Sequence, residues 1–320
     1  MNSDANNPEF SAIVVVGARQ DDLETLVEQY WRALGATGRT VELIAVIDGP
    51  RQDALDALES VRRSGVQVTI VQLSRMFGES SALMSGFDIA SGEIIITLPA
   101  YYQIDPEELP RLMEAAADSD VTLCRRTPRR GSAFERFRRR AFHGFLATIT
   151  SYRFHDLGCG VRALKRRVLE ELRLYGDQHR LLAVLARNAG FQVDEIDVRQ
   201  SDLDQFRSRY RIREYFHRLL DIFTVFFLVR FTKKPLRFFG MIGSVIFATG
   251  AVILTILVFE RLFMDVALAD RPAMLLSSLL SVLGLQLFSL GLLGELIIFT
   301  HAKSLKEYKI ERIVNFDDPT

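Results

Sequence analysis

Two long stretches without any charged side chain dominate the C-terminal third of the sequence. Residues 238–259 form one stretch of 22 residues, and residues 272–294 form a second of 23 residues. A helix of this length can cross a hydrocarbon core of roughly 30 Å, and helices of soluble proteins rarely run so far without a charge. We therefore predict two transmembrane helices within residues 236–300, with a pair of buried core helices as the alternative.

The flanks of these stretches predict their orientation. Lys233, Lys234 and Arg237 precede the first stretch, whereas the connector between the two carries acids and bases in near balance. Basic residues also follow the second stretch, at His301, Lys303, Lys306, Lys309 and Arg312. Because cytoplasmic flanks are rich in Lys and Arg, we expect a multi-pass protein of the inner (cytoplasmic) membrane with both termini in the cytoplasm. Residues 301–320 would be a cytoplasmic tail, and residues 1–10, which show no signal-peptide pattern, a disordered start.

Composition excludes several classes of protein. The 40 basic and 40 acidic residues give zero net charge, which argues against nucleic acid as a partner. Two cysteines, Cys124 and Cys159, are too few for a disulfide scaffold or a thiolate zinc site. A hydrophobic fraction of 48% is too high for a disordered chain.

The first two hundred residues alternate between apolar runs and segments with helical spacing. The expected strands are residues 11–16, 41–47, 66–73, 93–98 and 121–124, and the expected helices are residues 21–34, 54–61, 80–90 and 105–117. Such alternation predicts an α/β domain whose mostly parallel sheet is covered by helices on both faces. Ligands bind at the carboxyl ends of the strands in such sheets.

Polar residues at these strand ends are candidates for a binding site. Asp48 follows the second strand and can accept hydrogen bonds from a ribose or a base, or it can be an ordinary turn or cap residue. Arg75 can bind a diphosphate and Gly78 allows close backbone approach, although the same residues suit a simple strand-to-helix turn.

The order of motifs along the chain resembles family 2 glycosyltransferases that use a polyisoprenyl-phosphate acceptor, such as dolichol-phosphate mannose synthases and bacterial undecaprenyl-phosphate sugar transferases. The matching segments are residues 46–49, 74–78 (SRMFG), 92–110, 156–162 (DLGCGVR), 190–196, 208–210, 234–236 and 291–295, so the resemblance spans about residues 10–312. Each motif is weak alone, but their joint order is specific.

This resemblance implies a GT-A domain over residues 11–204 that binds a nucleotide sugar. By position, the residues implied for the nucleotide sugar are Gly17, Asp48, Arg75, Gly78, Tyr101 and Gln103. The resemblance also implies transfer of the sugar to a polyisoprenyl phosphate such as undecaprenyl phosphate. Asp156 matches an acid near the acceptor and is our candidate catalytic residue, with a satisfied turn as the alternative.

The chain departs from the family pattern where a metal is usually bound. Relatives carry an Asp-x-Asp motif after the fourth strand, but here Pro99 and Tyr101 stand at the two acidic positions. Mg²⁺ or Mn²⁺ is expected for the family, yet its ligands are replaced, because proline has no side-chain oxygen and a neutral phenol is a poor ligand for hard cations. We therefore predict no metal-binding residues.

Other departures surround that position. Residues 17–20 (GARQ) replace a Pro-x-Tyr-Asn-Glu type segment, and Ile47, Met76 and Glu79 also differ from the usual residues. A literal Asp-x-Asp occurs at residues 202–204, after the last expected strand, and we expect it to be a solvated loop.

Arginines are concentrated in two regions near the expected membrane. Residues 132–150 are predicted to form a basic interfacial helix and residues 205–235 a juxtamembrane amphipathic region, with solvated charge runs as the alternative. The arginines expected to bind the lipid phosphate are Arg126, Arg162, Arg207 and Arg209. Glu295, near the end of the second apolar stretch, is either functional or exposed at the interface.

The hypothesis from sequence is a membrane-bound glycosyltransferase that moves a sugar from a nucleotide sugar to a polyisoprenyl phosphate on the cytoplasmic leaflet, as a homo-oligomer. The alternative is a catalytically inactive relative that acts as a lipid-binding or partner-binding scaffold. A processive polysaccharide synthase would need a Gln-x-x-Arg-Trp motif, and the only tryptophan is Trp31 in the first helix.

Overall fold

A computed structural model describes residues 7–128, 154–172, 174, 176, 178–204, 235–264 and 272–301. These residues belong to two compact units, one within residues 1–222 and the other within residues 223–320. The predicted helix at 132–150 lies outside the described residues, and so does all but the last residue of the 205–235 region.

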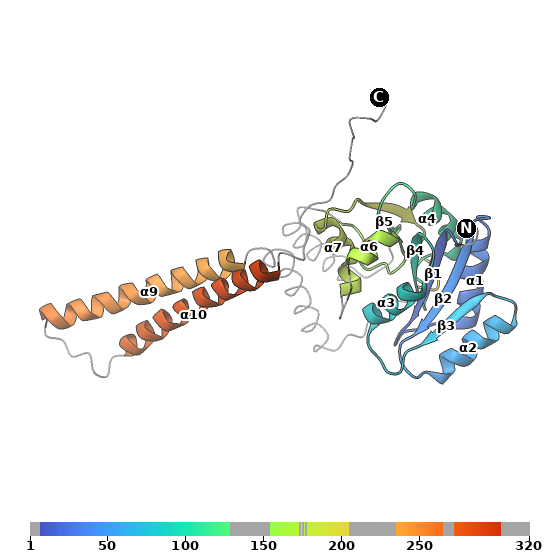
Figure 1. Ribbon diagram of the computed structural model, residues 1–320. Helices are drawn as coiled ribbons and strands as arrows, with labels where there is room; N and C mark the ends of the chain where they lie inside the picture. The colour runs from blue at the N-terminus through green and yellow to red at the C-terminus, as the bar shows by residue number, and fades with distance from the viewer. Residues whose placement is uncertain are drawn as a thin grey trace, which may run out of the picture. The chain divides into compact units, whose positions relative to one another are not determined.

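The first unit is built on a seven-stranded sheet (Figure 1). Its strands are β1 (Phe10–Val16), β2 (Val41–Ile47), β3 (Val68–Gln72), β4 (Ile94–Pro99), β5 (Val121–Arg126), β6 (Arg162–Lys165) and β7 (Val193–Val198). The spatial order is β3-β2-β1-β4-β6-β5-β7, and only β6 runs antiparallel to its neighbours. The prediction of a mostly parallel α/β sheet is confirmed.

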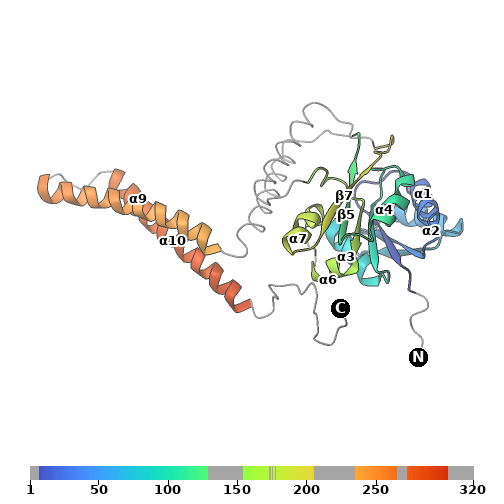
Figure 2. The same ribbon diagram turned by 90° about the horizontal axis from the view of Figure 1, so that it is seen from above.

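Helices cover both faces of this sheet (Figures 1 and 2). On one face lie α1 (Leu23–Gly35), α2 (Gln52–Arg63) and α4 (Leu109–Ala115), and on the other lie α3 (Glu79–Ile89), α6 (Arg166–Glu171) and α7 (Leu182–Asn188). Short 3-10 turns, η1 (Pro106–Glu108) and η2 (Gln178–Leu181), precede α4 and α7. The expected helix 105–117 is instead two consecutive elements, η1 and α4. The Asp105 side chain caps η1 by accepting a hydrogen bond from the Glu107 N–H.

The core follows from the alternation of side chains along buried strands. Val14 and Val16 belong to the hydrophobic cluster that also contains Leu26 and Tyr30 of α1. The opposite face of β1 is packed against α3, where a Cβ on Gly86 would come within 2.6 Å of the Ile13 side chain. Both faces of the sheet are thus filled at its centre, which explains why β1, β2 and β4 consist mostly of apolar residues.

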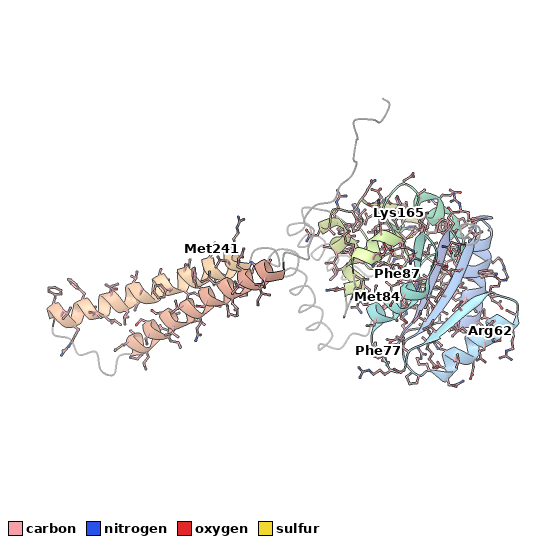
Figure 3. All side chains as sticks on the ribbon, in the orientation of Figure 1. Arg62, Phe77, Met84, Phe87, Lys165 and Met241 are labelled. Atoms are coloured by element: carbon pink, nitrogen blue, oxygen red, sulfur yellow. The ribbon has the colours of Figure 1, made fainter. Side chains whose placement is uncertain are left out.

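The second unit is a pair of long helices, α9 (Pro235–Met264) and α10 (Pro272–His301), of 30 residues each. Both are long and apolar enough to be candidate membrane spans. Apolar side chains project from them along their whole length (Figure 3), and Leu275 is 76% exposed. Buried core helices would cover such side chains, so the observed exposure favours the prediction of membrane helices.

Small residues allow α9 and α10 to touch through their backbones. A Cβ on Gly284 would lie 2.4 Å from the backbone nitrogen of Phe247, and one on Gly243 would lie 2.7 Å from the carbonyl of Gly284. Glu295 of α10 also accepts a hydrogen bond from the Leu236 N–H, at 3.4 Å. That N–H is one of the donors at the start of α9 without an intrahelical acceptor, so Glu295 serves as a cap from the neighbouring helix.

Candidate functional site

Polar residues from distant parts of the chain meet at one edge of the sheet. The parallel strands β1 to β5 end at this edge, and antiparallel β6 begins there with Arg162. Gly17, Asp48 and Tyr101 follow β1, β2 and β4, whereas Arg126 is the last residue of β5. The topology therefore places the sequence-predicted residues of the described segments around a common edge.

Asp48 organises the loop between β3 and α3. Its carboxylate is 3% exposed and accepts hydrogen bonds from the N–H groups of Phe77, at 2.7 Å, and Gly78, at 3.0 Å. Gly78 has a φ of 95°, which favours glycine. Arg75 in the same loop lies over the Phe77 ring, with 4.7 Å from its Cζ to the ring centroid. The structure thus brings three of the predicted nucleotide-sugar residues together, because Asp48, which follows β2, anchors the loop that carries Arg75 and Gly78.

Tyr101 and Gln103 form a second cluster after β4. The Gln103 amide donates to the Tyr101 hydroxyl at 2.9 Å, and its carbonyl oxygen accepts from the Gly160 N–H at 2.6 Å. The Arg19 guanidinium lies over the Tyr101 ring, 3.9 Å from its centroid. Burial, with a further contribution from the charge of Glu79, raises the pKa of Tyr101, so its phenol stays neutral.

Arg126, Asp156 and Asp204 form a buried ion cluster. The Arg126 side chain donates to Asp156 at 2.7 and 3.0 Å and to Asp204 at 3.2 Å, and all three side chains are at most 5% exposed. Burial opposes the charge of Arg126, but the hydrogen bond to Asp156 and the two carboxylate charges raise its pKa above the usual range. The expectation of a solvated loop at 202–204 was wrong for Asp204, because its carboxylate is needed as the second partner of Arg126.

Arg162 is also buried, but it binds backbone oxygens. It donates to the carbonyls of Cys159, at 2.9 Å, Leu157, at 3.1 Å, and His179, at 2.5 Å. Burial lowers its pKa. Arg126 and Arg162 therefore both hold the fold together around residues 156–162, and Arg207 and Arg209 lie outside the described residues.

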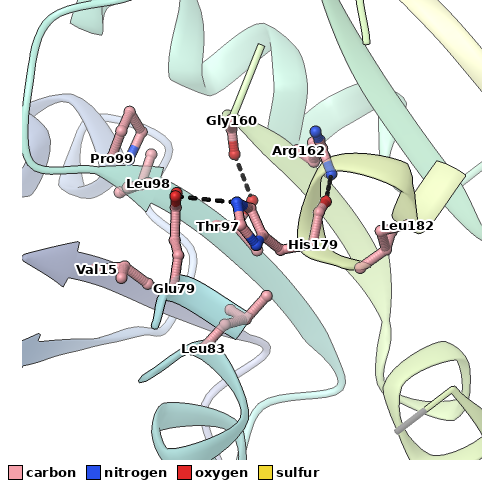
Figure 4. A pocket seen from close by; sticks show the side chains of 10 residues that line it. All are labelled: Val15, Glu79, Leu83, Thr97, Leu98, Pro99, Gly160, Arg162, His179 and Leu182. Atoms are coloured by element: carbon pink, nitrogen blue, oxygen red, sulfur yellow. Dashed lines mark hydrogen bonds and ion pairs between the residues drawn. The ribbon is translucent and has the colours of Figure 1, made fainter. Parts of the chain in front are cut away.

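A small cavity of about 40 Å³ lies beside Arg162 and is lined by Thr97, Pro99, Glu79 and His179, among others (Figure 4). His179 contacts the Glu79 carboxylate through Nε2 and the Ser80 hydroxyl through Nδ1, both at 3.0 Å. Burial works against ionisation of Glu79, yet the hydrogen bond from His179 lowers its pKa. The cavity has room for a few water molecules.

Sequence reasoning missed four residues of this edge: Arg19, Asp204, Glu79 and His179. Glu79 was noted only as a departure from the family pattern, and Arg19 only as part of the altered segment 17–20. Their roles depend on contacts across the sheet edge, which no local pattern reports.

The donor set at the usual metal position does not fit Mg²⁺ or Mn²⁺. Pro99 offers only its backbone carbonyl, which accepts from the Tyr30 hydroxyl at 3.2 Å, and Tyr101 carries a neutral phenol. No group of three His, Cys, Asp or Glu side chains that could hold a metal occurs among the residues with described positions. Mg²⁺ and Mn²⁺ are usually held by one or two carboxylates together with other oxygens, and the two positions that carry acids in relatives offer no carboxylate here.

Solved structures with a similar fold include complexes of glucosyl-3-phosphoglycerate synthase. The chain resembles glucosyl-3-phosphoglycerate synthase from Mycobacterium tuberculosis in complex with phosphoglyceric acid, with a TM-score of 0.52 and 16% identity over 69% of this chain and 80% of that one. The same enzyme in complex with Mn²⁺, UDP-glucose and phosphoglyceric acid gives a TM-score of 0.50, with 15% identity over 69% and 79%. These similarities confirm the GT-A fold.

Similarity to curated sequences extends over nearly the whole chain. An undecaprenyl-phosphate 4-deoxy-4-formamido-L-arabinose transferase from Edwardsiella ictaluri (strain 93-146) is 30% identical over 99% of this chain and 98% of its own length. The enzyme of the same name from Klebsiella pneumoniae (strain 342) is 30% identical over 95% and 93%. The sequence model described as Glycosyl transferase family 2 matches residues 11–173, more than half of the chain. The resemblance carried by the motifs is thus confirmed, and this polypeptide belongs to glycosyltransferase family 2.

Proposed function

We propose that this glycosyltransferase moves a sugar from a nucleotide sugar to undecaprenyl phosphate at the cytoplasmic face of the inner membrane. The observation that carries the proposal is the end-to-end similarity to transferases named for that lipid, which includes the α9 and α10 region as well as the GT-A domain. The apolar helix pair would keep the enzyme at the bilayer, where the lipid phosphate is accessible. A sugar of the 4-deoxy-4-formamido-L-arabinose kind is the first candidate, because that name recurs among the relatives.

The donor would lie along the sheet edge, over the loop that Asp48 anchors. Arg75 and Gly78 are proposed to face the nucleotide diphosphate, and Tyr101 and Gln103 to line the sugar side. The space beside Gly17 is open, because a Cβ there would meet no atom within 4 Å, and a ligand could approach the backbone at this point. Support for this assignment is the convergence of strand ends, the position at which open α/β sheets bind ligands.

The acceptor is already an anion, so it requires positioning more than deprotonation. Asp156 has both carboxylate oxygens engaged by Arg126, and we propose that it contributes by holding this arginine in place. With the donors of Arg126 and Arg162 directed at protein oxygens, the direct lipid-phosphate contacts are assigned to Arg207 and Arg209. Cytoplasmic termini and a homo-oligomer complete the proposal.

The test is transfer by the purified full-length chain. The chain is incubated with undecaprenyl phosphate and a panel of nucleotide sugars in Mg²⁺, Mn²⁺ or EDTA, and lipid-linked product is measured by mass spectrometry. Undecaprenol without phosphate is the matched control. We expect product from the phosphorylated lipid only, with little dependence on the cation.

A second candidate function is supported by Pro99 and Tyr101, which replace the acidic pair used by relatives. A catalytically inactive relative could retain the lipid surface and serve as a scaffold. Absence of turnover together with absence of nucleotide binding in all three conditions would favour this candidate over the enzyme.

A further inference from the structure

The Tyr101 side chain is held at a fixed place on the sheet edge. On either side of it, the Ala100 carbonyl accepts from the Asp21 N–H and the Tyr102 N–H donates to the Asp21 carboxylate, both at 2.9 Å. The Arg19 guanidinium packs on one face of the ring, with 3.9 Å from its Cζ to the ring centroid. The backbone and the ring of Tyr101 are thus both fixed, and the residue is still partly exposed.

A chain of hydrogen bonds decides how the Tyr101 hydroxyl is used. The Gly160 N–H can only donate, so at 2.6 Å it must face the carbonyl oxygen of the Gln103 side chain. The Gln103 amide nitrogen therefore faces Tyr101, and because it too can only donate, the phenol oxygen is the acceptor at 2.9 Å. Gln103 is 3% exposed, and Gly160 is held in turn by the Thr97 hydroxyl, which donates to its carbonyl at 2.6 Å (Figure 4).

The hydroxyl proton of Tyr101 is therefore directed away from Gln103. Within the described part of the chain, this hydroxyl makes no other hydrogen bond. Burial raises the pKa of Tyr101, so the proton stays on the phenol oxygen at neutral pH. A neutral O–H donor that is fixed in place and has no protein acceptor is suited to bind an oxygen atom of a ligand.

We propose that the Tyr101 hydroxyl donates a hydrogen bond to the oxygen that joins the sugar of the donor to its diphosphate, and that Gln103 is the positioning residue that orients it. This inference rests on the proposed function, in which Arg75 faces the diphosphate and Tyr101 lines the sugar side. The joining oxygen lies between these two parts of the donor.

The hydrogen bond would act on the bond that breaks. In the transfer, an oxygen of the lipid phosphate forms a bond to the anomeric carbon, and the bond from that carbon to the diphosphate oxygen breaks. The electron pair stays on that oxygen, and the Tyr101 hydroxyl stabilises the negative charge that develops there. The proton remains on Tyr101, because a diphosphate oxygen is a far weaker base than a phenolate.

Tyr101→Phe is the direct test, because it removes the hydroxyl and keeps the ring under Arg19. Initial rates of lipid-linked product are measured with the purified full-length chain, undecaprenyl phosphate and the nucleotide sugar that gives product in the transfer assay. Since the charge on the leaving oxygen develops in the transition state, we expect kcat to fall about ten- to a hundredfold. The KM for the nucleotide sugar should change by less than about twofold.

Gln103→Glu tests the positioning role through a pH profile. An ionised carboxylate at this position can only accept, so it turns the Tyr101 proton towards itself, whereas a protonated carboxyl can still donate to the phenol. The rate relative to wild type should therefore fall as the pH rises through the pKa of the introduced carboxyl. In the Tyr101→Phe background the same substitution should have little further effect, because both residues belong to one hydrogen-bond chain.

Tyr102→Phe is the matched control. It removes a hydroxyl one residue along the chain, and that hydroxyl already donates to the Gln29 side chain at 3.1 Å. We expect the kcat of this variant to lie within about twofold of the wild type. Thermal unfolding of each variant shows whether it remains folded.

The inference is overturned if Tyr101→Phe turns over at the wild-type rate, or if it raises KM and leaves kcat unchanged. A Gln103→Glu rate that keeps a constant ratio to wild type at every pH overturns the positioning role. Each of these results leaves the proposed function standing. If the wild type makes no product from any nucleotide sugar of the panel, the proposed function falls and this inference falls with it.

Discussion

Replacement of Asp156 by alanine tests whether this carboxylate holds the fold or serves the chemistry. The Arg126 and Asp156 side chains are 5% and 2% exposed, and they are joined by two hydrogen bonds of 2.7 and 3.0 Å. Removing one partner of a buried ion pair costs about 3–5 kcal/mol, because the other charge stays buried without compensation. Asp204 still accepts from Arg126 at 3.2 Å, so the lower figure of about 3 kcal/mol applies.

For a domain of this size, such a loss lowers the unfolding temperature by about 6–12 °C. We expect this shift in thermal unfolding of the detergent-solubilised chain, followed by intrinsic fluorescence. The double variant Asp156→Leu with Arg126→Met removes both charges, and it should be less destabilised than Asp156→Ala alone.

Asp156→Asn is the informative comparison for activity, since it retains one acceptor oxygen for Arg126. The reasoning would be refuted by an Asp156→Ala protein that unfolds within about 1 °C of the wild type yet makes no product. That result would mean that the carboxylate acts on the substrates directly and that the Arg126 contacts are incidental.

Three further changes probe other parts of the molecule. Asp48→Ala leaves two backbone N–H groups of the β3–α3 loop without their acceptor, so it should lower the free energy of unfolding by about 1–3 kcal/mol. It should also raise the KM for the nucleotide sugar, and an unchanged KM would contradict the anchoring role of Asp48. Glu42 accepts hydrogen bonds from Ser11, Ser91 and Gly92, which outweigh its burial and lower its pKa. The ionised Glu42 therefore adds to the free energy of unfolding at pH values above its unfolded pKa of about 4.3. This contribution is lost as the pH falls through the lower pKa that Glu42 has in the folded protein. Denaturant unfolding from pH 6 down to pH 3 should show a weaker acid dependence in Glu42→Gln than in wild type, and identical profiles would count against this account. Gly284→Ile should separate α9 and α10 and destabilise the pair by about 1–3 kcal/mol, since even a Cβ there would lie 2.4 Å from a backbone nitrogen. Cysteines placed on the two helices should then form fewer disulfide cross-links. Leu285→Ile is the control, because Leu285 is 58% exposed.

The elements that sequence could predict are those with one dominant local signal. Strands β1 and β4 are mostly apolar runs, and α1 combines helical spacing with an Asp22 cap that accepts from the Thr25 N–H. Strand β6 carries no such signal, because its four residues begin with Arg162 and end with Lys165, and it exists only through pairing with β4 and β5.

The residues of the candidate site likewise fall into those that a local sequence signal locates and those that it does not. Asp48 and Tyr101 could be located because they follow recognisable strands at motif positions. Asp204 could not, because its burial depends on Arg126, which lies 78 residues earlier in the chain. Arg19 likewise gains its position from Asp21 and Ala100, whose contact joins loops about eighty residues apart.

The reversed direction of β6 has a consequence for how this enzyme can diversify. The chain leaves β5 after Arg126 and re-enters the sheet at Arg162, and both points lie at the edge where the parallel strands end. The intervening segment is therefore attached to the sheet at the same edge at both of its ends, the edge at which we propose that the donor binds. Substitutions or insertions within residues 127–161 are therefore expected to leave the pairing of β6 with β4 and β5 intact, which would let this part of the sequence change while the sheet stays the same.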